Sequence, residues 1–229
     1  MFLAKLQSSA WWRARVRLAF VLGCLLLPAL AQRSTPTVTF ACDFPGSAPD
    51  HYVISVSEAG SASYDSDGKL TPESGGDPFH SDFSLSQAGR ARIFDLAKRA
   101  HYFEGQVDSK NRNLANTGSK TLTYKDAQKS TRASYNYSPL PPVQELTAFF
   151  QALSATLEFG RRLDYYLHYE KLALDEELKK MEEMSKGGGL GEISAVAPVL
   201  QKIADDPAVI KVSRARAQRL LQLAELGSK

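Results

Sequence analysis

The feature that most constrains the fold is a change of hydrophobic period at the prolines between residues 139 and 142. Before them, several short segments alternate apolar and polar residues, namely 38–41, 52–56, 120–124 and 131–137. Such alternation is typical of antiparallel strands with one buried face. After the prolines, apolar residues recur every three or four positions, as in amphipathic helices. The sequence therefore predicts an α+β fold, in which an antiparallel β-sheet with packed helices is followed by an all-helical C-terminal tail.

One helix is also expected among the strands. The apolar residues at 93, 96, 97, 100 and 103 share a helical face, and Gly105 is expected to end the helix. Ser84 and Gln87 have the spacing of a capping box at its start. Ahead of this helix, residues 62–64 are expected to pair back on 52–56, and Asp67-Gly68 is typical of a tight turn.

The helical pattern from Pro142 to Lys186 is too long for one helix inside a compact domain. It would run about 68 Å at 1.5 Å per residue, whereas a domain of this size is about 42 Å across. The helix must therefore break or project from the body of the domain, and we favour a break or bend near Gly160, because glycine costs about 1 kcal/mol inside a helix. A Gly-rich linker follows at 187–191, then a short helix over 193–204. Asp206-Pro207 is expected to cap and begin the last helix.

Residues 1–31 have the pattern of a secretory signal peptide. Four basic residues precede an apolar run over 18–27, and Ala29 and Ala31 form a small-x-small cleavage site before Gln32. The whole apolar stretch from Leu18 to Ala31 has 14 residues, which falls short of the roughly 20 that cross a bilayer. We therefore expect a periplasmic or secreted protein with no transmembrane segment after cleavage. An alternative is a lipid anchor at Cys24, because residues 21–24 resemble a bacterial lipobox.

The expected organisation is a signal peptide over 1–31, an α+β domain over 32–158 and a helical C-terminal region over 159–229. The leader holds four of the 28 Lys and Arg residues and no acid, so 24 remain against 25 Asp and Glu. The mature chain then lacks a net positive field, which argues against a nucleic-acid partner. Cleavage also leaves Cys42 alone, so no internal disulfide can form.

The motifs that could carry chemistry are isolated. Ser66 and Lys69 match S-x-x-K but lie in a turn pattern, whereas serine acylases need a helix start. Asp164 and His168 have a metal-ligand spacing without a third ligand nearby. The remaining histidines at 51, 80 and 101 are scattered, and no G-x-S-x-G motif occurs. The sequence therefore predicts no catalytic residues, no cofactor and no metal site, and a buried, unreactive Cys42.

Tyrosines are the best candidates for contact with a partner. Tyr165, Tyr166 and Tyr169 cluster on the helical stretch, and tyrosine is enriched at binding surfaces, although packing between helix and sheet is the alternative. A basic stretch at 211–219 is expected to face water. These features favour a non-enzymatic protein that acts through contacts with an envelope protein, in an oligomeric state the sequence leaves open. The alternatives are a hydrolase whose site forms only in three dimensions, or a structural envelope component.

The segments Tyr102–Gly105 and Asn116–Tyr124 resemble those of a family of uncharacterised secreted or periplasmic bacterial proteins, a domain of unknown function. The resemblance covers roughly residues 38–157. It implies the same order of paired strands, a helix that ends in an aromatic residue, a polar Thr-Gly loop, a hairpin and a further helix. It also implies a Gram-negative setting, and it brings no activity and no site residues.

Overall fold

The computed structural model describes residues 35–70, 75–111 and 113–227. The expected cleavage residues Ala29, Ala31 and Gln32, and the alternative lipid site at Cys24, lie outside these described residues. The described residues group into one compact unit. Its elements confirm the predicted α+β fold, with an antiparallel sheet first and a helical tail after it.

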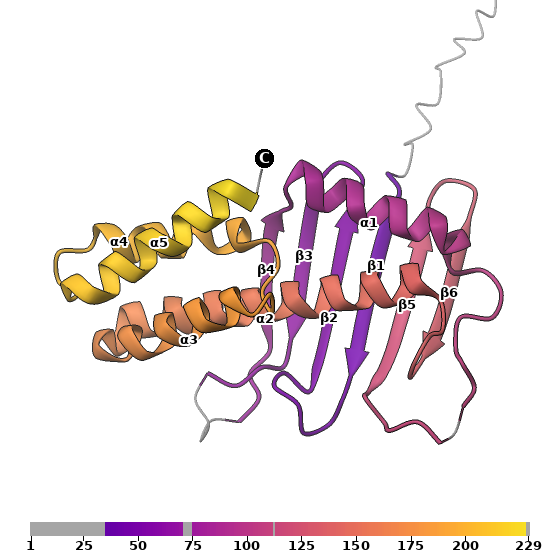
Figure 1. Ribbon diagram of the computed structural model, residues 1–229, viewed down its shortest axis with the longest axis horizontal. Helices are drawn as coiled ribbons and strands as arrows, with labels where there is room; N and C mark the ends of the chain where they lie inside the picture. Colours follow the sequence, from indigo (N-terminus) through magenta and orange to yellow (C-terminus); the bar gives the residue numbers. More distant parts are fainter. Residues whose placement is uncertain (1–34, 71–74, 112, 228–229) are drawn as a thin grey trace, which may run out of the picture. The chain divides into compact units, whose positions relative to one another are not determined.

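The six strands of this sheet lie in the order β4-β3-β2-β1-β5-β6, and each neighbouring pair is antiparallel (Figure 1). They are β1 (Thr37–Asp43), β2 (His51–Ser57), β3 (Ser61–Ser66), β4 (Phe79–Ser84), β5 (Ser119–Lys125) and β6 (Ser130–Tyr135). The expected pairing of 62–64 with 52–56 is confirmed, with Tyr64 opposite Ile54. Strand β6 ends at Tyr135, so Tyr137 lies beyond it. The N-terminal strand β1 lies in the middle, which moves β4 to one edge.

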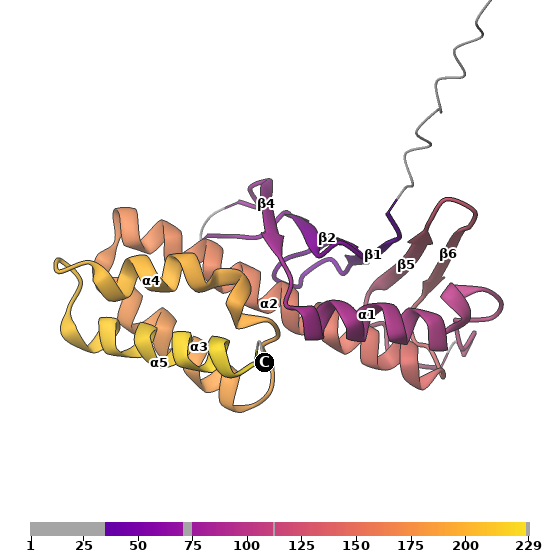
Figure 2. The ribbon, with the colours of Figure 1, turned by 90° about the horizontal axis from the view of Figure 1, so that it is seen from above.

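Two helices cover the same face of the sheet (Figures 1 and 2). They are α1 (Gln87–Arg99) and α2 (Pro141–Tyr169). Under them, the inward residues of β1 to β3 are almost all buried, and the ring of Phe40 stacks on that of Phe150 with 5.2 Å between centroids. The opposite face carries short hydroxyl side chains, such as Thr39, whose Oγ1 lies 3.0 Å from Oγ of Ser55. The core therefore lies on one side of the sheet, as the alternation predicts.

Helix α2 does not break at Gly160, so that prediction is wrong. The helix continues to Tyr169, and the chain turns at Glu170 into the 3₁₀ helix η2 (Lys171–Ala173) and then α3 (Leu174–Lys186). A Cβ at Gly160 would collide with the side chain of Val196. The absence of a side chain at Gly160 therefore allows α2 and the tail to pack closely, and this packing outweighs the low helix propensity of glycine.

Two helix starts also differ from the predictions. Ser84 is the last residue of β4, and Ser86 caps α1 instead, with its Oγ accepting from the Gly89 amide at 2.9 Å. Helix α1 ends at Arg99, where the 3₁₀ helix η1 (His101–Phe103) follows before Gly105. Asp206 does not start the last helix, because it ends α4 and its carboxylate accepts from the side chain of Lys171 at 2.6 Å.

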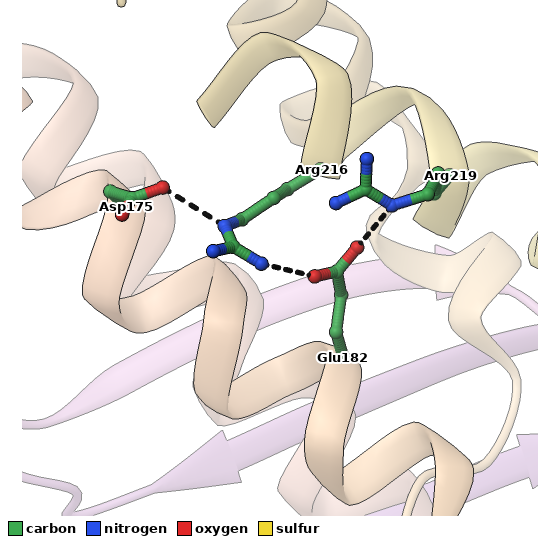
Figure 3. Close-up of polar contacts among 4 residues, drawn as sticks. All are labelled: Asp175, Glu182, Arg216 and Arg219. Atoms are coloured by element: carbon green, nitrogen blue, oxygen red, sulfur yellow. Dashed lines mark hydrogen bonds and ion pairs between the residues drawn. The ribbon is translucent and has the colours of Figure 1, made fainter. Parts of the chain in front are cut away.

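The tail consists of α3, the 3₁₀ helix η3 (Ile193–Val196), α4 (Ala197–Asp205) and α5 (Lys211–Gly227). Ion pairs join α5 to α3 (Figure 3). Arg216 donates to Asp175 at 2.9 Å and to Glu182 at 2.6 Å, and Arg219 donates to the other oxygen of Glu182 at 2.7 Å. The expectation that this basic stretch faces water is wrong for Arg216, whose side chain is only 20% exposed.

The segment after the triple glycine is anchored on the two sheet-covering helices. The Gly191 amide donates to the carbonyl of Ala152 at 3.2 Å and to Oγ1 of Thr156 at 3.1 Å. The Glu192 carboxylate accepts from the amide and hydroxyl of Ser86 at 3.1 and 3.0 Å. The expected division between residues 158 and 159 lies inside α2, which contributes both to the cover of the sheet and to the helical tail.

Candidate functional site

A groove lies beside the edge strand β4, where helix α2 extends past the sheet. The 29 residues of α2 span about 43 Å, whereas a six-stranded sheet is only about 24 Å wide. The second half of α2 therefore projects beyond β4 and meets α4 (Figures 1 and 2). The resulting space, here called the edge groove, has a volume of about 690 Å³. Its lining includes Phe79 and Ser81 of β4, Arg161, Tyr165 and Tyr169 of α2, and Val199 of α4.

Strand β4 has a hydrogen-bonded neighbour on one side only, within the described residues. The Leu85 amide donates to the Gly60 carbonyl at 3.1 Å, and the Asp77 amide donates to the Gly68 carbonyl at 3.2 Å. These two bonds flank the β3–β4 ladder and set its phase. Hydrogen-bonded and non-hydrogen-bonded pairs alternate in an antiparallel ladder. The backbone amides and carbonyls of residues 80, 82 and 84 therefore point away from β3, toward the free edge.

The side chains of β4 alternate between the two faces of the sheet. Phe79, Ser81 and Phe83 are half-buried and lie on the helix-covered side, where Phe79 and Ser81 line the edge groove. The side chains of His80 and Asp82 are exposed and lie on the open face, and Asp82, whose backbone points to the free edge, also lines the edge groove. A further strand beside β4 would continue this alternation, so every second side chain of that strand would enter the edge groove.

A buried arginine joins α2 to both ends of the β3–β4 connection. Arg161 is 8% exposed, and its two terminal nitrogens donate to the carbonyls of Gly68 at 3.0 Å and Asp77 at 3.1 Å. Its guanidinium carbon lies 4.8 Å from the centroid of the Phe79 ring. Hydrogen bonds from a charged donor are the stronger kind in proteins. This residue therefore holds the first residue of β4 against the helix that forms the groove.

One turn earlier on α2, a buried carboxylate accepts hydrogen bonds from two hydroxyl groups of β3. Glu158 accepts from the Tyr64 hydroxyl at 2.8 Å and from the Ser66 hydroxyl at 2.6 Å. Burial, together with the Glu158 carboxylate, raises the pKa of Tyr64 well above its usual range. Tyr64 therefore remains a protonated donor at all physiological pH values. The Ser66 hydroxyl of the S-x-x-K spacing thus donates to Glu158 on α2 and joins β3 to this helix.

The three tyrosines predicted as partner contacts, Tyr165, Tyr166 and Tyr169, do not all lie in the edge groove. Tyr165 and Tyr169 line the edge groove with their ring centroids 5.0 Å apart, and Tyr169 is 75% exposed. Tyr166 is half-buried and packs against the core instead. Sequence reasoning missed Phe79, Arg161 and Val199 as groove residues. Phe79 and Phe83 flank a short polar segment in the sequence, and nothing local to it indicates that it would form an edge strand.

Three histidines, His51, His80 and His168, pair with carboxylates on the surface. Nδ1 of His51 lies 2.5 Å from Asp43, and Nδ1 of His80 lies 2.7 Å from Asp65. The hydrogen bond with Asp65 raises the pKa of His80. Among the described residues, no hydrogen bond joins any of these rings to a serine or cysteine, and no group of three potential metal ligands occurs. Asp164 and His168 lie 3.8 Å apart, and Asp164 also lies 3.8 Å from Lys202.

A second cavity of about 450 Å³ contains a buried lysine. The Lys120 ammonium donates to the carbonyls of Thr117, Gly118 and Asn136, and to the hydroxyl of Thr117, at 2.8 to 3.1 Å. Burial lowers its pKa. Cys42, which lies opposite Lys120 in the β1–β5 register, is a free buried thiol as expected, and burial raises its pKa. Because all three ammonium protons have acceptors, this lysine stabilises the loop before β5.

No protein-family profile matches the chain, and no curated protein matches it either. Within the described ranges, no helix combines the length and the apolar character that crossing a membrane requires.

Proposed function

We propose that the protein binds an extended segment of a partner protein, which adds as a strand along β4 and places alternate side chains in the edge groove. The supporting observation is that a free strand edge and a lined groove lie side by side. In strand addition, backbone hydrogen bonds supply affinity and the pockets for alternate side chains supply specificity. Both components are present at this one edge of the sheet.

The groove distinguishes this edge from an ordinary exposed strand. An unpaired edge is a template for association, and proteins commonly blunt it with charges or cover it. Here the covering helix extends beyond the edge, so an added strand would have apolar and aromatic side chains under it and solvent above it. Tyr165 and Tyr169 supply large contact surfaces at low entropic cost, as aromatic residues do at binding sites. The proposal thus keeps the tyrosine contacts with a partner that the sequence suggests, and it adds hydrogen bonds between the partner and the backbone of β4.

The proposed setting is the periplasm or the cell exterior, with an envelope protein as the partner. This part of the proposal is supported by the leader pattern over residues 1–31, with its basic residues, its short apolar run and its small-residue cleavage site.

The test is a selection of displayed random dodecapeptides on the immobilised protein, with His80→Pro as the diagnostic variant. The amide of His80 points to the free edge, so proline there removes a docking donor and spares the β3 ladder. Arg132→Pro, on the opposite edge strand β6, is the matched control. The Asp126 amide donates to the Lys129 carbonyl, and this bond sets which residues of β5 and β6 form hydrogen-bonded pairs. The backbone amide of Arg132 therefore points away from β5, as that of His80 points away from β3.

The expected result is that selected peptides bind the unmodified protein and Arg132→Pro equally, and bind His80→Pro at least tenfold more weakly. Hydrogen exchange should show new protection of the amides of residues 80, 82 and 84 in the complex. The proposal fails if the selection yields no binder, or if the binders leave β4 unprotected and bind His80→Pro with unchanged affinity.

A further inference from the structure

We infer that the segment bound along β4 has an apolar–basic–apolar pattern, with its basic side chain on the open face of the sheet beside Asp82. This inference rests on the proposed function and names the chemistry of the partner. It depends on two independent properties of the site, the register of an added strand and the charge of the open face at this edge.

The register follows from the phase of the β3–β4 ladder. We take the added strand to be antiparallel to β4, as every neighbouring pair in this sheet is. The backbone of Asp82 points to the free edge, so one residue of that strand would form a hydrogen-bonded pair directly opposite it. Directly opposite residues place their side chains on the same face of a sheet, with Cβ atoms about 5 Å apart. The residue opposite Asp82 therefore lies on the open face. Its two neighbours, opposite Ser81 and Phe83, lie on the groove side.

The open face at this edge is acidic. Its positions on β1 to β4 include Asp43, Asp65 and Asp82 and contain no lysine or arginine. Asp43 and Asp65 each pair with a histidine at 2.7 Å or less. The Asp82 side chain is 83% exposed, and its ion-pair partner is Nε2 of His80 at 3.4 Å. An opposite charge across a strand pair stabilises it, whereas a like charge destabilises it. Lysine or arginine therefore fits the position opposite Asp82.

The groove side favours apolar residues. The rings of Phe79, Tyr165 and Tyr169 and the side chain of Val199 line it. Of its charged lining residues, Asp164 and Lys202 lie 3.8 Å apart and offset each other, and the guanidinium of Arg161 is buried and donates to the carbonyls of Gly68 and Asp77. Side chains that enter the groove thus meet mainly apolar surface, which gains free energy when it leaves water. A basic side chain beside Asp82 on the open face and apolar side chains on the groove side together give the apolar–basic–apolar pattern.

The experiment compares two synthetic peptides, acetyl-Ser-Thr-Ile-Lys-Val-Thr-Leu-Ser-amide and the same peptide with Glu in place of Lys. Binding is measured by titration calorimetry to the unmodified protein, Asp82→Lys and Asp95→Lys. Asp95 lies on α1 with a 63% exposed side chain, so its variant changes the net charge equally at a remote site. A third peptide, Ser-Thr-Lys-Ile-Val-Thr-Leu-Ser with the same end groups, has the same composition and places the basic residue in the same phase of the alternation as Val and Leu.

The Lys peptide should bind the unmodified protein about five- to tenfold more tightly than the Glu peptide, from the strength of cross-strand charge pairs. Asp82→Lys should reverse this order, and Asp95→Lys should preserve it. The third peptide should bind more weakly than the Lys peptide. An equal ratio of Lys-peptide to Glu-peptide affinity in all three proteins would refute the charge assignment alone, provided that His80→Pro still weakens binding at least tenfold. Absence of that proline effect would refute strand addition itself. A concentration-dependent dimer that His80→Pro abolishes would identify a second copy of this chain as the occupant and overturn the inference.

Discussion

The guanidinium of Arg161 lies over the ring of Phe79, with 4.8 Å between the guanidinium carbon and the ring centroid. The same guanidinium donates to the carbonyls of Gly68 and Asp77, which flank the β3–β4 connection. One residue of α2 thus sets the position of the edge strand and also lines the groove beside it. The geometry of the proposed docking edge therefore depends on a side chain that comes from the covering helix.

Arg161→Met should lower the free energy of unfolding by about 2 to 3 kcal/mol, because it removes charged hydrogen bonds to two carbonyls. Urea denaturation measures the loss, and hydrogen exchange should show faster exchange in β4 than in β6. Arg99→Met is the control, since Arg99 forms an exposed pair with Asp95 and should change stability by less than about 0.5 kcal/mol. Uniform loss of protection across the sheet would contradict a local role for Arg161.

Gly160→Ala should destabilise the protein by about 1 to 3 kcal/mol, although alanine is the better helix former. The added methyl group would collide with Val196 across the interface between α2 and η3. Val196→Ala in the same chain should recover part of the loss, so the two substitutions should be non-additive. Thermal denaturation of the four proteins of this cycle is the measurement, and a more stable Gly160→Ala protein would show that the contact can relax without cost.

Tyr169→Ala should weaken the binding of selected peptides about tenfold and leave the unfolding free energy unchanged. Tyr169 is 75% exposed and contacts the ring of Tyr165 in the groove, so its truncation removes binding surface rather than core. Leu172→Ala is the matched control, because Leu172 is 82% exposed nearby and does not line the groove. Equal effects of the two substitutions on affinity would place the contact outside the groove.

Glu182 should make the tail sensitive to acid. Burial opposes its ionised form, but the hydrogen bonds from Arg219 and Arg216 outweigh burial and hold its pKa below the ordinary value of 4.5. Because the pKa is lower in the folded state than in the unfolded state, this contribution to stability is complete above about pH 4.5 and declines as the pH falls below it.

Glu182→Gln, which removes the charge at nearly constant size, should lower stability at pH 7 and flatten its decline below about pH 4.5. Chemical denaturation at a series of pH values checks both effects. Glu176→Gln, at an exposed position that pairs with Lys180 at 3.9 Å, should leave the pH dependence unchanged. An identical acid transition in Glu182→Gln would assign the effect to other carboxylates.

Cleavage after Ala31 should give a mature protein with tyrosine fluorescence only, because Trp11 and Trp12 are the two tryptophans of the chain. The measurement is the emission spectrum of protein collected from the periplasm or medium, with excitation at the indole absorption. Mass spectrometry of the same sample locates the new N-terminus. Strong indole emission from exported protein would contradict cleavage at this site.

Much of the fold follows from local patterns in the sequence. The alternation of apolar and polar residues over 52–56 and 120–124 corresponds to β2 and β5, with the predicted face buried. Helix boundaries were less accurate, since competing caps such as Ser84 and Ser86 differ only in where the preceding strand ends. The break expected at Gly160 failed because the low helix propensity of one glycine is a small local term that a packing contact overrides.

What the sequence by itself determines here is the type of each element and the face it buries, because both depend on neighbours within a few positions along the chain. What only the tertiary structure decides is that β4 lies at an edge. That outcome depends on β1 pairing with β5, about eighty residues away, and on α2 being longer than the sheet is wide. Alternation along β4 is the same whether the strand is central or at an edge, since side-chain direction is independent of which backbone groups have partners. The edge groove therefore exists only in three dimensions.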